Sequence, residues 1–263
     1  MKKLLLISLL FLSVNCVAQT TAQPFLFNVN TLTGDKPYWN LQYSGSYGER
    51  ATGQFGYDGL GQQFGLKSYL GNRFTLYATA AVGFANGGGV SSAQQAEVLR
   101  DFIGGKKAEG FRLGAGLGAS RDWSNVKSAI SRIALSFDQQ KWRAAGNLRF
   151  EKAFDSSRDK LDFISSLGFQ YRLAPALFLG FEAIGQDLEG FWDKEEAEGG
   201  AKLMVGPSIN LKPQNSRLSF SIAGGPVFYA TRSNIIPSEA IRELGASANG
   251  YSLRALVNFE LYK

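Results

Sequence analysis

The sequence contains no histidine and a single cysteine, Cys16. Without histidine the chain cannot form a Ser-His-Asp triad, a Cys-His pair or a histidine zinc site. It also lacks the side chain that most often transfers protons near neutral pH. Because Cys16 lies in an N-terminal segment that we expect to be removed, the mature chain is predicted to carry no disulfide and no thiol chemistry.

The N-terminal sequence MKKLLLISLLFLSVNCVAQ has the pattern of a secretory signal. Two lysines are followed by an apolar run and a small-residue exit at Ala18. The run is too short to span a membrane, so residues 1–18 are predicted to be a cleaved signal peptide. A lipid-modified Cys16 is the alternative, but Asn15 stands where lipoprotein signals carry a small residue.

After the signal, no stretch is long and apolar enough for a membrane-spanning helix. Instead, apolar residues alternate with small or polar ones, as in RFTLYATAAVGFA at residues 73–85. Successive side chains of a strand point to opposite faces, so Phe74, Leu76 and Val82 share one face. The 31 glycines and 20 phenylalanines also suit strands and turns better than helix bundles.

The alternation recurs along the chain and predicts an all-β protein, a closed antiparallel transmembrane β-barrel of about 12 strands. The predicted strands are 39–47, 62–70, 73–84, 94–103, 110–121, 128–137, 141–154, 161–172, 176–184, 201–211, 218–231 and 251–262. Their connections alternate between long and short, which predicts longer external loops and short periplasmic turns. Residues 37–263 are therefore predicted to be the barrel, and residues 19–36 an N-terminal periplasmic segment.

Several features predict that the apolar faces meet lipid. Aromatic residues stand near the ends of these faces, as at Trp142 and Phe150, and such residues form girdles at the two membrane interfaces. Unpaired strand edges are costly in lipid, so the last strand is expected to pair with the first. The opposite faces carry charges that suit a wet or ion-paired lumen. The predicted lumen-facing charged residues are Arg112, Arg132, Arg143, Arg149, Glu151, Asp162, Arg172, Glu182, Lys202, Arg254 and Glu260, with Lys67 in the same inward basic set.

From residue 38 to residue 263 the chain resembles the small outer-membrane β-barrel proteins of Gram-negative bacteria. The resemblance rests on the export signal, the alternating pattern, the loop asymmetry and the C-terminal strand YSLRALVNFELYK. Such barrels often end on an aromatic residue that the assembly machinery reads, whereas Tyr262 is penultimate here. The resemblance implies a location in the cell outer membrane, with membrane lipid and the barrel-assembly machinery as partners. It supplies no activity.

The charged interior leaves two alternatives for the lumen. Basic residues outnumber acidic ones on the inward faces, which suggests a narrow pore for a small solute with a mild anion preference. The small inward residues of 114–118 and 219–225, opposite the arginines, would leave space for it. Alternatively the charges pair and plug the barrel, because lone charges in a confined lumen are costly. Arg149 and Asp162, diagonal neighbours in a rough hairpin register, are one candidate pair.

The most distinctive loop is GQDLEGFWDKEEAEGG, residues 185–200. Its acidic residues are Asp187, Glu189, Asp193, Glu195, Glu196 and Glu198. Carboxylates suit Ca²⁺ or Mg²⁺, but the spacing matches no EF-hand loop, so a solvated external loop with an aromatic anchor is favoured. No metal site and no cofactor are predicted. A helical pattern at residues 236–245 predicts either a lid over the mouth or a helix resting on its own loop.

Three functional hypotheses remain. The leading one is a non-catalytic outer-membrane barrel that acts as a narrow pore or a surface protein. An outer-membrane enzyme acting on lipids would need a Ser-Lys or carboxylate arrangement in place of histidine, and the sequence shows no such constellation. A soluble periplasmic carrier of apolar ligands would turn the apolar faces inward. Nucleic acid is not expected as a partner, because the basic residues are scattered.

Overall fold

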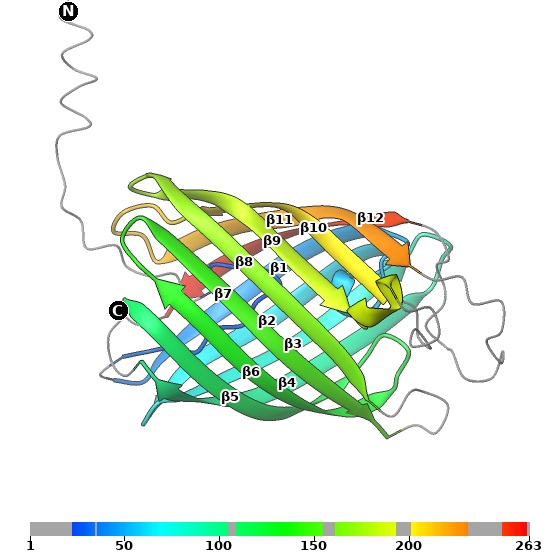
Figure 1. Cartoon of the computed structure of the whole chain (residues 1–263), viewed down its shortest axis with the longest axis horizontal. Helices are drawn as coiled ribbons and strands as arrows, with labels where there is room; N and C mark the ends of the chain where they lie inside the picture. Colours follow the sequence, from blue (N-terminus) through cyan, green and yellow to red (C-terminus); the bar gives the residue numbers. More distant parts are fainter. Residues whose placement is uncertain are drawn as a thin grey trace, which may run out of the picture.

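The chain folds as a closed barrel in which each strand is antiparallel to both neighbours (Figure 1). A computed structural model describes residues 23–34, 36–104, 109–154, 161–192, 201–230 and 249–261. Its strands are β1 (Tyr38–Glu49), β2 (Gly59–Gly71), β3 (Phe74–Ala85), β4 (Val90–Ile103), β5 (Gly110–Arg121), β6 (Lys127–Asp138), β7 (Trp142–Ala153), β8 (Asp162–Ala174), β9 (Leu177–Gln186), β10 (Ala201–Leu211), β11 (Leu218–Ala230) and β12 (Gly250–Glu260). Two short 3₁₀ turns, η1 (Gly53–Phe55) and η2 (Leu188–Phe191), lie between strands.

Strands that follow one another in sequence are neighbours in the sheet, and β12 closes the barrel against β1. We call the end that carries the connections after odd-numbered strands the loop end, and the opposite end the turn end. The predicted fold class is confirmed: the described residues form 12 strands in one closed barrel. The largest difference from the predicted bounds is in β4, which begins at Val90 rather than at residue 94.

The apolar faces point out of the barrel. Phe64 is 64% exposed and Leu117 72% exposed, whereas the alternate residues Lys67 and Leu99 are fully buried. An apolar exterior around a polar interior is the reverse of a soluble barrel, which hides its apolar face inside. The soluble-carrier hypothesis required apolar faces turned inward, and the observed orientation is the opposite. Among the described residues, no helix has the length and apolar character to cross a membrane.

Aromatic side chains pair on the outer surface near both ends of the strands. Toward the turn end, Trp142 stacks on Phe137 with ring centroids 4.8 Å apart and lies 6.1 Å from Phe169. Toward the loop end, Phe150 and Phe163 lie 5.0 Å apart. These pairs join rings on neighbouring strands, as cross-strand positions on one face allow. The two groups match the interfacial girdles predicted from the sequence.

Two prolines interrupt one ladder without shifting it. Between β10 and β11, Met204 pairs with Val227 and Ser208 with Ala223, so the register is the same on both sides of the gap. The β10–β11 ladder omits the pairs around Pro207 and Pro226, because proline has no N–H to donate.

Candidate functional site

The interior of the barrel is occupied by the segment that precedes β1. Within residues 23–34, which we call the N-terminal segment, Phe25 and Asn28 are each 1% exposed and Leu32 is 4% exposed. Residues 19–36 were predicted to form an N-terminal periplasmic segment. Residues 23–34 instead lie inside the lumen of the barrel. Residues 19–22 and 35 are outside the described residues.

The wall holds the backbone of the N-terminal segment through side chains. Its acceptors for backbone N–H groups are Glu182 for Phe27 (2.8 Å), Asn147 for Val29 (2.7 Å) and Thr75 for Leu32 (2.8 Å). Asn147 also donates from Nδ2 to the carbonyl of Val29 at 2.8 Å. Backbone groups that leave water need such partners, since each unsatisfied one is costly to bury. The segment is thus bonded to β3, β7 and β9 and does not merely fill space.

Lys67 links Gln23 and Asn30, two residues seven positions apart in the N-terminal segment. Its ammonium donates to Oε1 of Gln23 at 2.6 Å and to Oδ1 of Asn30 at 2.7 Å. Nε2 of Gln23 in turn donates to the carbonyls of Phe25 (2.5 Å) and Asn28 (2.6 Å). These bonds fold residues 23–30 into a compact loop. Because Lys67 is fully buried, its charge depends on these oxygens and on the surrounding network for compensation.

Two phenylalanines anchor the loop among apolar and cationic groups. Phe27 packs in a buried cluster that includes Phe55 and Met204, and the guanidinium of Arg254 lies 4.8 Å from its ring centroid. Phe25 lies against Gly168, where an added Cβ would come within 2.5 Å of its ring. A cation over an aromatic face is favourable, more so when desolvated.

Ion pairs line the lumen beside the segment. Arg132 holds Glu97 with two hydrogen bonds, from Nε (2.7 Å) and Nη2 (2.8 Å). Arg149 pairs with Glu151 and lies 3.8 Å from Glu97. The register sets Arg149 opposite Ile164, which leaves Asp162 diagonal to it as predicted, but the ion pairs of Arg149 run to the two glutamates. Arg112 pairs with Asp138 nearer the turn end.

The predicted lumen residues differ in burial. The buried ones are Arg112, Arg132, Arg143, Arg149, Glu151, Asp162, Glu182 and Lys202. Arg172, Arg254 and Glu260 are half-buried. Glu260 accepts from Lys212 at 2.5 Å, and Arg172 lies 4.8 Å from the ring centroid of Phe178.

Several interior residues were not identified from the sequence. They are Glu97, Asp101 and Asp138. Glu97 and Asp101 lie on β4, where neither phase is cleanly apolar, so the inward face could not be chosen. Asp138 was assigned to a turn but ends β6. The alternation also predicts that Asn147 and Gln170 share the inward faces of Arg149 and Asp162, and both amides are buried.

The space beside the small inward residues of β5 is occupied by other side chains. An added Cβ at Gly116 would meet Leu99, and one at Gly118 would meet Glu97. At Gly114 it would collide with the methyl group of Thr31 in the N-terminal segment. The sequence suggested that these low walls would leave a passage. That expectation is corrected here, because wall side chains and the segment fill the space beside β5.

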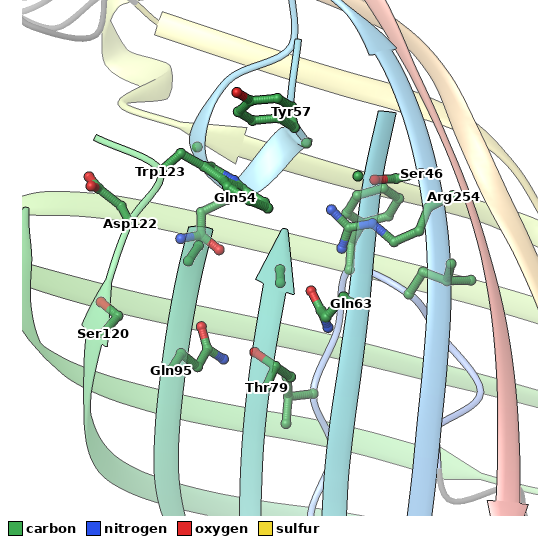
Figure 2. A pocket seen from close by; sticks show the side chains of 18 of the residues that line it. Ser46, Gln54, Tyr57, Gln63, Thr79, Gln95, Ser120, Asp122, Trp123 and Arg254 are labelled. Carbon is green, nitrogen blue, oxygen red and sulfur yellow. The ribbon is translucent and has the colours of Figure 1, made fainter. Parts of the chain in front are cut away.

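Cavities lie toward both ends of the described barrel. The loop-end cavity has a volume of about 130 Å³, and Leu26, Phe27 and Val29 of the N-terminal segment form part of its lining. Figure 2 shows Tyr57 and Trp123 side by side at this cavity, and their ring centroids are 4.7 Å apart. The turn-end cavity, of about 650 Å³, is lined by Leu32, Thr33 and Gly34 of the segment together with the β2–β3 turn. The segment therefore borders both cavities.

The β1–β2 connection narrows the loop end further. Phe55 of η1 is fully buried, and its carbonyl accepts from Ser252 at 2.6 Å. Gln54 reaches inward and donates to Glu151 at 3.2 Å (Figure 2). Because this connection folds into the barrel, the mouth is smaller than the strand framework alone would make it.

The acidic loop is described only in part. Asp187 accepts from the backbone N–H of Phe163 at 3.3 Å, and Glu189 is exposed on η2. Asp193, Glu195, Glu196 and Glu198 lie outside the described residues, as does the helical pattern at 236–245. Within the described ranges, no group of three or more Cys, Asp or Glu side chains is placed to hold a metal ion.

Comparison with known proteins finds a similar fold among solved structures only. No family model matches the chain, and no curated protein matches it. Solved structures do. The chain is similar to the NanC porin (11% identity, TM-score 0.56, covering 84% of this chain and 100% of that one). It is also similar to the KdgM porin (9%, 0.55, 85% and 99%) and to an outer membrane channel from Pseudomonas putida F1 (10%, 0.53, 88% and 97%). At these identities the likeness establishes the barrel fold.

Proposed function

We propose that this protein is an outer-membrane barrel that forms a narrow, non-catalytic channel for small polar solutes, and that the N-terminal segment closes it in the described state. The observation that carries the proposal is the division of the barrel into an apolar exterior and a charged interior. Aromatic pairs such as Trp142 with Phe137 suit two lipid interfaces, and buried charges such as Arg132 suit an aqueous path.

The likeness to two porins and an outer membrane channel supports a pore over other roles for this fold. The absence of histidine from the whole sequence supports a role without acid–base catalysis. The proposed location is the outer membrane, reached after export. It rests on the apolar outer faces of the strands and on the N-terminal signal pattern. Mass spectrometry of the purified mature protein tests the export step. We expect an N-terminus at Gln19, and retention of residues 1–18 would contradict it.

A mild anion preference is proposed for the open state. If the N-terminal segment leaves, the wall of the lumen presents more cations than anions. The cations are Lys67, Arg112, Arg132, Arg143, Arg149, Lys202 and Arg254, and the anions are Glu97, Asp101, Asp138, Glu151, Asp162 and Glu182. Most of these groups compensate one another, so the surplus is small and the preference should be weak.

Planar-bilayer recording tests the channel. The full mature chain should conduct rarely, whereas the Phe25→Ser, Phe27→Ser double variant should conduct often, because both ring anchors of the segment are lost. In a salt gradient the reversal potential should indicate anion preference. If both proteins migrate as folded, heat-modifiable barrels and neither conducts, the channel proposal fails. Clear cation selectivity would overturn the anion preference alone.

A further inference from the structure

The barrel wall meets the N-terminal segment partly through contacts that do not depend on sequence. Asn147 pairs with both the N–H and the carbonyl of Val29, at 2.7 and 2.8 Å, and Glu182 accepts from the N–H of Phe27 at 2.8 Å. The wall therefore holds the backbone of Phe27 and of Val29, whichever side chains these positions carry. Main-chain hydrogen bonds of this kind supply affinity in peptide recognition.

Other contacts select side chains. Gly168 leaves room for the ring of Phe25, and an apolar cluster receives the ring of Phe27. The wall also binds carboxamide side chains, because Lys67 donates to Asn30 at 2.7 Å and Ser166 donates to Asn28 at 2.9 Å. Rings at alternate positions followed by amide side chains therefore form the pattern that the wall accepts. Backbone contacts supply affinity in such sites, and side-chain pockets supply specificity.

The wall groups are also held by one another, apart from their contacts with the segment. Oδ1 of Asn147 accepts from Arg132 at 3.0 Å, and the same arginine is fixed by its double bond to Glu97. Oε1 of Glu182 accepts from Ser208 at 2.7 Å, and Ser208 itself accepts from Gln170 at 2.6 Å. A site whose polar groups are already oriented loses less conformational freedom on binding.

We propose that the lumen is a peptide-binding site, which the N-terminal segment occupies in cis and which a separate peptide of the same pattern occupies in trans. The ligand class is a short peptide that folds into the same loop, with aromatic residues at two alternate positions followed by asparagine side chains. The proposal rests on the same interior as the channel proposal, but it concerns binding and requires no conductance.

The test uses the full mature chain with Phe25→Ser and Phe27→Ser, so that the barrel wall is unchanged while the cis segment is weakened. The probe is a fluorescently labelled synthetic peptide with the native sequence of residues 23–34, QPFLFNVNTLTG. Fluorescence anisotropy in detergent should show saturable binding. A peptide with serine at both phenylalanine positions should bind about a hundredfold more weakly, because two ring burials are lost.

Two further proteins complete the test. Asn147→Ala in the double-variant background should weaken binding of the native peptide by about tenfold, since two hydrogen bonds to the peptide disappear. The chain without substitutions should bind at least about tenfold more weakly than the double variant, since its own segment competes. Heat-modifiable gel migration establishes that each barrel is folded.

Equal affinity for the native and serine-substituted peptides would overturn the proposal. So would unchanged binding by folded Asn147→Ala protein, or the absence of saturable binding by the folded double variant. The two proposals can fail independently. A barrel that binds the peptide and never conducts would refute the channel proposal and support the peptide-binding proposal. A barrel that conducts without binding the peptide would refute only the peptide-binding proposal.

Discussion

The carboxamide of Asn147 and the peptide unit of Val29 face each other inside the barrel, each donating one hydrogen bond to the other. The two residues are 118 positions apart in sequence. Oδ1 of Asn147 also accepts from Arg132, which holds Glu97. The N-terminal segment is therefore connected directly to the buried ion-pair network of β4, β6 and β7, and changes in that network should affect how firmly the lumen is closed.

Replacing Glu182 by glutamine should loosen the N-terminal segment. The two carboxylate oxygens of Glu182 accept from Phe27 N–H and from Ser208, and a glutamine can present only one acceptor oxygen to these two donors. Loss of a charge-assisted hydrogen bond costs about 1.5 kcal/mol or more, so the open fraction in planar bilayers should rise about tenfold. Glu189→Gln, on the exposed η2 turn, is the matched control. Equal open fractions for the two variants would refute the role of Glu182.

Replacing Lys67 by methionine should expose the segment to solvent. Methionine keeps much of the side-chain volume but cannot donate to Gln23 and Asn30, which Lys67 now joins. Hydrogen exchange at the amides of Phe27 and Val29 should accelerate by about tenfold or more, because exchange requires these bonds to open. Lys212→Met is the control, because it removes the same charge near the turn end, where Lys212 donates to Glu260. The prediction is wrong if the segment amides exchange equally fast in both variants.

Replacing Arg132 alone should destabilise the barrel more than replacing both Arg132 and its partner Glu97. Both side chains are buried, and Arg132→Met deprives Glu97 of two hydrogen bonds. Loss of one partner of a buried pair typically costs about 3–5 kcal/mol, whereas replacing both by apolar residues is often close to neutral. In urea unfolding in detergent, the free energy of unfolding should therefore be lower for Arg132→Met than for the double variant that also carries Glu97→Met. A double variant less stable than the single one would contradict this reasoning.

Substituting alanine for Gly83 should disturb the loop-end mouth. An added Cβ at Gly83 would lie 2.6 Å from the ring of Tyr57, which packs beside Trp123 at the cavity. The ring must move, so the near-ultraviolet circular dichroism of this aromatic pair should change. Gly45→Ala is the control, because nothing lies within 4 Å of its added Cβ. Identical spectra for the two variants would show that the Tyr57 position does not depend on Gly83.

The strands were predictable because their pattern is local. β5 and β10 have the bounds that the alternation predicts, since every second residue must face a different environment whatever its partner strand is. The outward direction of Phe64 and the burial of Arg149 follow from the same parity. Where parity is ambiguous, prediction failed: β4 carries no clean apolar face, so Glu97 was missed although it is the partner of Arg132.

The sequence by itself determined the closed antiparallel barrel, its apolar exterior and the charge of its interior, because a two-residue period fixes which side chains share a face. Only the tertiary structure decided that residues 23–34 lie inside. This segment has no strand partner, and its position depends on Lys67, Thr75, Asn147 and Glu182, which four different strands bring together. Bonds between residues so distant in sequence leave no local pattern from which they could be inferred.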